Sequence, residues 1–205
     1  MGFSQNNEDQ IISDYFGSNK PTCLSLGENN GVHLSNVRQM IIQGSAAVLV
    51  EPAPLAFIQL QELYMYREDV HCFNLAVSDY NGKATFFDSG VHLGKNDSSL
   101  LSSLHETEIK KWEKSTSFKE IQVNVVDFNI LLEMSPYKKF QLISIDVEGS
   151  DVVCLKQMDL TALGCELLCI EWNSIESNRK VITEYANRHG LNLIHTNLEN
   201  LIFAK

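Results

Sequence analysis

The sequence lacks the features that mark membrane-spanning and nucleic-acid-binding proteins. No apolar run in its 205 residues approaches the roughly 20 residues that a membrane-spanning helix needs. It has no basic run interleaved with aromatic residues, and its formal net charge is −10. A surface this acidic repels phosphate backbones, so nucleic acid is not an expected partner. The polar, acidic residues 1–10 do not form a signal peptide, so we expect a cytoplasmic protein.

Paired cysteines are also missing. The five cysteines form an odd set without a C-x-x-C pair. Four of them, Cys23, Cys72, Cys165 and Cys169, lie in strand-like apolar runs, which is typical of reduced thiols packed as small apolar groups. We therefore expect neither a disulfide framework nor a cysteine metal site.

The order of apolar runs and helical patterns predicts an α/β fold. The runs that indicate buried strands lie at 22–27, 46–52, 70–78, 140–145 and 165–173. Helical patterns alternate with most of them, which predicts a doubly wound, mostly parallel sheet with helices on both faces. Two final runs, "LNLIHT" and "NLIFAK", are joined by a tight connection and predict an antiparallel C-terminal hairpin.

Local signals define several of the expected helices. Leu34, Val37 and Ile41 recur at helical spacing, and Pro54 suits the first turn of the next helix. Asp127 is a candidate N-cap for a short helix that continues through Met134. Two further helices are expected over 151–159 and 176–190, and the second ends at a glycine.

The middle of the chain departs from this alternation. The segment 81–90, "NGKATFFDSG", has an Asn-Gly turn before an aromatic strand, which predicts a hairpin. Residues 91–117 are polar and rich in serine. This stretch is either a lid over an acceptor or a solvated connection. We expect one domain over 1–205, with the hairpin and the lid at about 81–120.

The end of the first expected strand favours an adenosine-containing cofactor. Gly27 and Gly31 bracket a tight turn into a helix, whose free N–H groups favour a polar or anionic ligand. The second strand ends in Glu51, and a carboxylate there is placed to accept both hydroxyls of a ribose. The alternative is that Glu51 is a solvated strand end before the turn at Pro52 and Pro54.

The loop composition discriminates between two such cofactors. A dinucleotide fingerprint, G-x-G-x-x-G, needs a middle glycine so that the pyrophosphate can approach the backbone. Here Asn29 occupies that position, between Glu28 and Asn30. S-adenosylmethionine has no phosphates, so the loop favours it over NAD.

Carboxylates follow the fourth expected strand at once. Asp146 and Glu148 are two residues apart and would share a face if the strand continued. Buried strand ends rarely carry paired carboxylates unless something binds beside them. The alternative is that Asp146 caps a loop and Glu148 or Asp151 supplies an acid to the next helix. We favour a functional role for Asp146 and Glu148.

A second hypothesis for this edge of the sheet is a magnesium site. Glu171 and Asn173 end the fifth expected strand and would share a face by the same spacing. With Asp146 they would form an oxygen-rich set of ligands, which Mg²⁺ prefers. The alternative is that Asn173 begins a loop and Trp172 packs in the core.

Together these motifs resemble the FkbM-type methyltransferases, which use S-adenosylmethionine and have the Rossmann-like class I fold with a seven-stranded sheet. The resemblance runs almost end to end. It rests on "SQNNEDQII", "LGENNG" with "LSNV", "VLVEPAP", "LAVSDYNG", "ISIDVEGSDVVCLKQMDL" and "IEWN". The chain departs from the family pattern at Ser25, where an acid is common, and in lacking a tryptophan before the second strand.

The resemblance implies methyl transfer to a hydroxyl of a sugar or another secondary metabolite, so the expected partner is a small-molecule or glycan acceptor. It implies that Gly27, Glu28, Asn29 and Gly31 form the loop that holds the methionine part. The other implied cofactor residues are Glu51 for the ribose, Pro52 beside it, Ser78 and Asp79 near the adenine, and Gln5 with Asp9 closing over the cofactor.

The chemistry then assigns a role to the paired carboxylates. Methyl transfer is an in-line displacement, so alignment is the main task of the enzyme. Asp146 is the candidate base for the acceptor hydroxyl, with Glu148 orienting or assisting; a bound Mg²⁺ would instead lower the pKa of the hydroxyl. The competing hypotheses are a non-catalytic adenosine-binding module, a nicotinamide-dependent reductase and a nucleic-acid methyltransferase.

Overall fold

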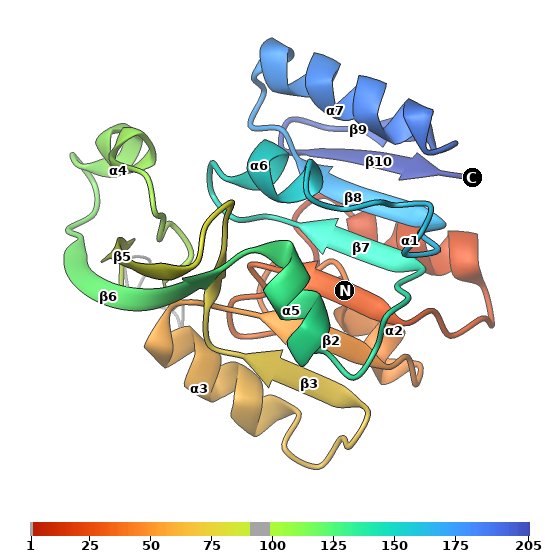
Figure 1. Cartoon of the computed structure of the whole chain (residues 1–205), viewed down its shortest axis with the longest axis horizontal. Coiled ribbons are helices and arrows are strands. Elements are labelled where there is room, and N and C mark those ends of the chain that lie inside the picture. The colour runs from red at the N-terminus through yellow and green to blue at the C-terminus, as the bar shows by residue number, and fades with distance from the viewer. Residues whose placement is uncertain (1, 91–98) are drawn as a thin grey trace.

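A seven-stranded sheet forms the centre of the molecule in the computed structural model, which describes residues 2–90 and 99–205 (Figure 1). Its strand order is β3-β2-β1-β7-β8-β10-β9. All neighbours are parallel except β10, which runs antiparallel to both β8 and β9. The strands are β1 (Cys23–Leu26), β2 (Ala47–Val50), β3 (Val70–Phe73), β7 (Leu142–Ile145), β8 (Leu167–Glu171), β9 (Asn192–Thr196) and β10 (Asn200–Ala204). The predicted parallel sheet with an antiparallel C-terminal hairpin is therefore confirmed.

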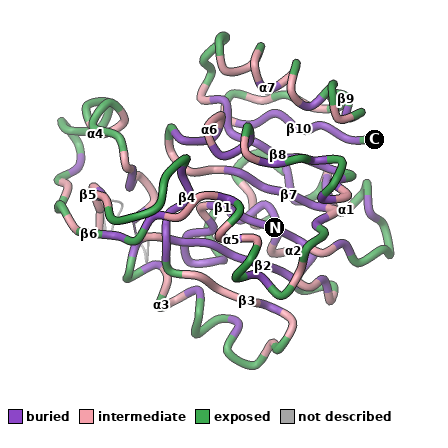
Figure 2. The backbone as a smooth tube through the Cα atoms, viewed as in Figure 1, coloured by how far each residue is buried: buried purple, intermediate pink, exposed green. Residues whose placement is uncertain are grey.

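Two hydrophobic cores cover the two faces of this sheet. Alternate residues of one strand enter different cores: Leu24 and Leu26 pack in one, and Cys23 packs in the other. The first core receives α5 (Phe128–Met134), α6 (Asp151–Leu155) and α7 (Glu176–Arg188), and the second receives α1 (Glu8–Phe16), α2 (Arg38–Ile42) and α3 (Pro54–Leu63). Figure 2 shows the central strands buried along their length. Burial on both faces explains why these strands are continuous apolar runs.

A second, three-stranded sheet replaces the predicted hairpin. Its order is β4-β6-β5, formed by β4 (Ala76–Val77), β5 (Gly82–Asp88) and β6 (Lys119–Val126). The predicted tight hairpin at 81–90 is wrong, because β6 lies between the two strands that flank the Asn-Gly dipeptide. Asn81 instead exchanges hydrogen bonds with Asp127: its side-chain amide donates to the carboxylate at 2.6 Å, and its carbonyl accepts from the backbone N–H at 2.8 Å.

Two expected elements differ in their bounds. The strand expected over 70–78 is divided between the two sheets, because Asn74 turns the chain and donates its side-chain amide to the carbonyl groups of Glu51 and Pro52. The helix expected from Leu34 begins only at Arg38, since Leu34 has a φ of 59° and is exposed.

The expected helix starts at Pro54 and Asp127 are confirmed. Pro54 begins α3, where its missing N–H costs no hydrogen bond. The Asp127 carboxylate caps α5 by accepting a hydrogen bond from the Ile130 N–H at 3.0 Å. All five cysteines carry free thiols. Among the described residues, no helix combines the length and apolar character that crossing a membrane requires.

Candidate active site

A cavity of about 680 Å³ opens at the carboxyl ends of the parallel strands. The loop after β1 contributes Gly27, Glu28 and Asn29 to its lining, and Glu51 with Pro52 follows β2. The lining also includes Asp146 and Glu148 after β7, and Glu171 and Asn173 from the end of β8. The chain crosses the sheet in opposite directions from β1, and an open α/β sheet binds ligands at such a switch point.

Close contact between two strand ends requires glycine at position 27. Gly27 has a φ of 79°, and a Cβ atom added there would lie 1.7 Å from the carbonyl oxygen of Asp146. Its N–H donates to the Val50 carbonyl at 2.9 Å. Gly27 therefore lets the β1 loop pass between the ends of β2 and β7, where the cavity forms.

Gly31 has a different role from the one the motif implies. It does not line the cavity, and a Cβ atom added there would lie 2.7 Å from Leu60 and 3.2 Å from Tyr64. The absent side chain thus lets the loop pack against α3. Gly31 acts on the shape of the loop from behind the cavity.

Glu51 is buried and rigidly held at the end of β2. One carboxylate oxygen accepts a hydrogen bond from the Asn29 N–H at 2.9 Å, and the other accepts from the Ala53 N–H at 2.7 Å. Burial raises the pKa of Glu51 to about 7, against these two hydrogen bonds. The carboxylate joins the loops after β1 and β2 and faces the cavity.

Glu28 is held in the same way on the other side of the β1 loop. The Ser35 hydroxyl donates to its carboxylate at 2.5 Å. Burial raises the pKa of Glu28 to about 7, although hydrogen bonds from Ser25 and Ser35 lower it. Glu28 is therefore a second buried acid in the half of the cavity formed by the loops after β1 and β2.

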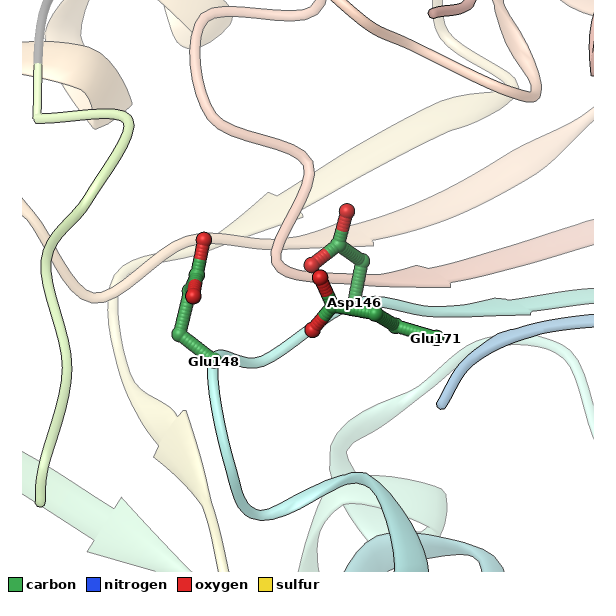
Figure 3. A group of neighbouring side chains, drawn as sticks. All are labelled: Asp146, Glu148 and Glu171. Carbon is green, nitrogen blue, oxygen red and sulfur yellow. The ribbon is translucent and has the colours of Figure 1, made fainter. Parts of the chain in front are cut away.

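Three carboxyl groups converge at the ends of β7 and β8. Asp146, Glu148 and Glu171 each place an oxygen within 4.8 Å of the others (Figure 3). The two-residue spacing predicted the correct pair for an incorrect reason, because β7 ends at Ile145 and Glu148 has a φ of 52°. A left-handed turn, rather than the period of a strand, brings Glu148 beside Asp146.

Asp151 fixes this turn. Its carboxylate accepts hydrogen bonds from the N–H groups of Val147 at 3.0 Å and Gly149 at 3.1 Å. Burial raises the pKa of Asp146 to about 7, and the Asp151 charge adds to the shift. Burial, followed by the Asp146 charge, raises the pKa of Glu148 and of Glu171 well above the usual range.

Asn173 lines the cavity but is not part of the converging group. Its side-chain amide donates a hydrogen bond to the Glu171 carboxylate at 2.8 Å. Among the described residues, the acids with the spacing of metal ligands are Asp146, Glu148 and Glu171. Glu148 thus occupies the place that the strand spacing gave to Asn173.

The residues expected near the adenine lie outside the cavity lining. Ser78 is buried, and its N–H donates to the Val126 carbonyl at 3.0 Å, whereas Asp79 is exposed. The preceding residues, Leu75 to Val77, line the cavity instead. They do so because β4 leaves the central sheet and pairs with β6.

The N-terminal segment lies at one border of the cavity. Gln5 lines it as expected, but Asp9 does not. The Asp9 carboxylate organises this segment by accepting from the Phe3 N–H at 2.6 Å and the Ser4 hydroxyl at 2.7 Å. Glu8, which no sequence motif singled out, is fully buried and accepts from Asn197 at 2.7 Å.

Residues from the middle of the chain form another wall that sequence reasoning missed. The apolar members of this wall are Phe86, Leu100, Leu101, Leu104 and Trp112. Two contacts join the same segment to the turn after β7: the Ser103 hydroxyl donates to the Glu148 carbonyl at 2.7 Å, and His105 Nε2 lies 2.7 Å from Ser150 Oγ. The described part of 91–117 therefore packs on the acidic turn; residues 91–98 lie outside the described residues.

The buried acids predict that the stability of the apo protein falls as pH rises. Burial raises the pKa of Glu28 from 4.5 to about 7 and that of Asp146 from 3.8 to about 7. The folded state therefore binds more protons than the unfolded state between about pH 4 and pH 7, and stability is lost through that window. Thermal unfolding followed by circular dichroism checks this.

Glu171→Gln is the matched variant for this pH dependence. It removes one buried charge and lowers the repulsion on Asp146, so its melting temperature should exceed that of the wild type increasingly as pH rises. Parallel melting curves for the two proteins across this range would contradict the assignment.

The fold and the position of the cavity define the class of protein. A parallel sheet with a reversed C-terminal strand and a cavity at the β1–β7 switch point is the Rossmann-like class I methyltransferase fold. Ribosomal protein L11 methylase from Lactobacillus delbrueckii subsp. bulgaricus is similar with a TM-score of 0.51, 8% identity, and coverage of 97% of this chain and 76% of that one. Aeropyrum pernix fibrillarin, solved with natively bound S-adenosyl-L-methionine, gives 0.50, 12%, 97% and 76%. Protein PH1948 from Pyrococcus horikoshii gives 0.53, 11%, 97% and 81%.

The family follows from the sequence. The profile of the methyltransferase FkbM domain matches residues 25–192, so the chain belongs to the FkbM family of S-adenosylmethionine-dependent methyltransferases. No curated protein matches the chain in sequence. The resemblance expected from the motifs is thereby confirmed.

Proposed function

We propose that this protein transfers the methyl group of S-adenosylmethionine to a hydroxyl of a sugar or another secondary metabolite, as a single methyltransferase domain over 1–205. The observation that carries the proposal is that one cavity joins two sets of acids. Glu51 is fixed at the end of β2, and Asp146 with Glu148 lies at the end of β7. The first suits a ribose and the second suits a reacting hydroxyl.

The cofactor half of the cavity is proposed around the loops after β1 and β2. Gly27, Glu28 and Asn29 would border the methionine part, Glu51 would accept the ribose hydroxyls, and Pro52 would lie beside them. Gln5 would cover the cofactor from the N-terminal segment. Gly31, Ser78 and Asp79, which lie outside the lining, would act only by shaping the loops.

The acceptor half is proposed around the acids after β7. Asp146 would take the proton of the acceptor hydroxyl, with Glu148 orienting that hydroxyl. A carboxylate is a weak base for an alcohol unless its pKa is raised, and burial raises the pKa of Asp146 to about 7. The described residues 99–112 would cover this half as an acceptor lid, in keeping with their contacts to Glu148 and Ser150.

A magnesium ion is an alternative source of activation at the same position. Three carboxyl oxygens within 4.8 Å of one another suit a small oxygen-seeking cation, so Asp146, Glu148 and Glu171 would hold it. The ion would supply a lowered pKa to the acceptor hydroxyl. Loss of transfer in a chelator, restored by added Mg²⁺, would favour this version over the carboxylate base.

The proposed setting is the cytoplasm, and the proposed acceptor is a small molecule or a glycan rather than nucleic acid. Five free thiols suit a reducing compartment. A net charge of −10 disfavours a nucleic acid acceptor.

Calorimetric titration with S-adenosylhomocysteine, with NAD⁺ in parallel, tests the cofactor assignment. We expect S-adenosylhomocysteine to bind and NAD⁺ to give no heat. Glu51→Ala should weaken binding at least tenfold, about 1.4 kcal/mol, because it removes the acceptor for the ribose hydroxyls and frees the Asn29 loop.

Glu62→Ala is the control for this titration, since it removes an exposed carboxylate of α3 that does not line the cavity. Equal affinity of wild type and Glu51→Ala would contradict the ribose role. Binding without methyl transfer to any hydroxylated acceptor would favour the alternative of a non-catalytic cofactor-binding module.

A further inference from the structure

The charged side chains that line the cavity are all acidic in the described part of the chain. Neither lysine nor arginine contributes to the lining, and His33 is the one titratable nitrogen there. The acids come from both halves and from the N-terminal border: Glu28, Glu51, Asp146, Glu148, Glu171 and Glu199. A ligand with a phosphate or carboxylate would therefore meet only like charges and neutral groups.

The basic side chains nearest to these acids are already engaged elsewhere. Arg38, which acts on Glu28, donates to the Gly31 carbonyl at 3.0 Å and stacks over the Phe3 ring at 5.0 Å. Lys111, which acts on Glu148, forms an ion pair with Glu108. Neither cation lines the cavity, so neither is placed to neutralise an incoming anion there.

The wall contributed by the middle of the chain has no compensating charge among its described residues. Phe86, Leu100, Leu101 and Leu104 give it an apolar surface, and Trp112 adds an indole ring that is 42% exposed. An apolar wall facing carboxyl groups suits a molecule with both C–H faces and hydroxyl groups. It offers an anion neither hydrogen-bonding cations nor water.

We propose that the acceptor enters this cavity without a phosphate or carboxylate group, and that phosphorylated and nucleotide-activated forms of the same molecule are excluded. This specificity rests on the methyl transfer proposed above. It is determined by Asp146, Glu148 and Glu171 on one side and by the uncharged wall from Phe86 to Trp112 on the other.

The proposal places the protein in a reaction sequence. If the acceptor is built from a phosphorylated or nucleotide-linked precursor, the phosphate must leave before methylation. The preceding reaction is then a group transfer that breaks the bond to the phosphate, either by moving the phosphoryl group to water or by moving the glycosyl group to another hydroxyl. Phosphate or nucleotide is released, and the methyltransferase receives the neutral product.

Transfer of a tritium-labelled methyl group tests this specificity on a mixture of acceptors. The full-length protein is incubated with labelled S-adenosylmethionine and the small-molecule fraction of an extract of its source cells, and the products are passed through an anion exchanger after the cofactor is removed. We expect at least tenfold more label in the unretained fraction than in the retained one. Equal labelling or an excess of retained label would overturn the proposal.

A pair of variants separates charge from shape. Leu101→Lys adds a cation to the uncharged wall, and Leu101→Gln is the neutral control of similar size. Leu101→Lys should label retained, anionic products at least tenfold more than Leu101→Gln does. If the two variants label that fraction equally, charge does not determine the exclusion and the proposal fails.

The outcome also distinguishes this inference from the proposed function. Label in retained products overturns the specificity while supporting methyl transfer. If S-adenosylhomocysteine binds by calorimetry but no fraction carries label, the methyl transfer itself is contradicted, and the specificity falls with it.

Discussion

Gly27→Ala should lower the free energy of unfolding by more than about 4 kcal/mol or prevent folding altogether. The added Cβ would lie 1.7 Å from the Asp146 carbonyl oxygen and 2.8 Å from its carbonyl carbon, both backbone atoms that no rotamer change can move. Relief requires the end of β7 to separate from the β1 loop. The Asp146 N–H donates to the Leu26 carbonyl at 3.0 Å, so this separation would also break the pairing beside the cavity.

Gly190→Ala is the matched control, because Gly190 has nearly the same φ, 77° against 79°, and nothing within 4 Å of the added Cβ. It should cost only about 1–2 kcal/mol, the ordinary penalty of a left-handed conformation for a residue with a side chain. Urea unfolding followed by circular dichroism measures both variants. Equal losses would mean that conformation alone, rather than the close approach of β1 to β7, requires glycine at position 27.

Gly27 also illustrates how far the sequence could predict the fold. Each parallel strand is buried on both faces, so its apolar run stands out, and the loops at the carboxyl ends follow directly from the order of the runs. The positions of Gly27, Glu28 and Glu51 at the cavity could therefore be predicted. The same reasoning placed Gly31 against the cofactor, because a sequence does not show that α3 packs behind the loop.

The second sheet marks the limit of that reasoning. β6 alternates apolar and polar residues, with Val123 and Val125 buried between exposed Gln122 and Asn124, and this signal was available but not used. The pairing of β6 with both β4 and β5 was not available, since it joins residues about 40 positions apart. Once β4 is drawn into this sheet, Ser78 lies outside the cavity and Leu75 to Val77 line it.

Glu148 shows a correct site predicted from an incorrect local structure. Burying two carboxylates at a strand end is costly, which indicated a site whatever the exact geometry. The left-handed turn at Glu148 depends on Asp151 below it and on Ser103 above it. Ser103 comes from a segment whose position in space the sequence did not reveal.

Asp146→Asn should reduce methyl transfer about 10²- to 10⁴-fold, the usual contribution of a general base. An asparagine side chain of nearly the same shape preserves the backbone contact with Leu26 but cannot take a proton. Transfer from tritium-labelled S-adenosylmethionine to the neutral small-molecule fraction measures the effect. Calorimetry with S-adenosylhomocysteine establishes that the cofactor still binds.

The same substitution should leave the melting temperature at about pH 8 unchanged or higher. Burial raises the pKa of Asp146 to about 7, so its charged form is unfavourable in the folded protein and a neutral amide removes that cost. A protein that becomes more stable as it loses activity has kept a destabilising group for its chemistry. Loss of activity in Asp146→Asn could then not be attributed to unfolding.

Asp79→Asn is the control, because Asp79 is exposed and does not line the cavity; it should keep both activity and stability. Full turnover by Asp146→Asn with normal cofactor binding would contradict both the base and the metal versions of the mechanism. A lost affinity for S-adenosylhomocysteine would instead assign Asp146 to the cofactor. If turnover falls, the chelator experiment decides between the two versions: a carboxylate base keeps its rate in the chelator, whereas a metal held by Asp146, Glu148 and Glu171 does not.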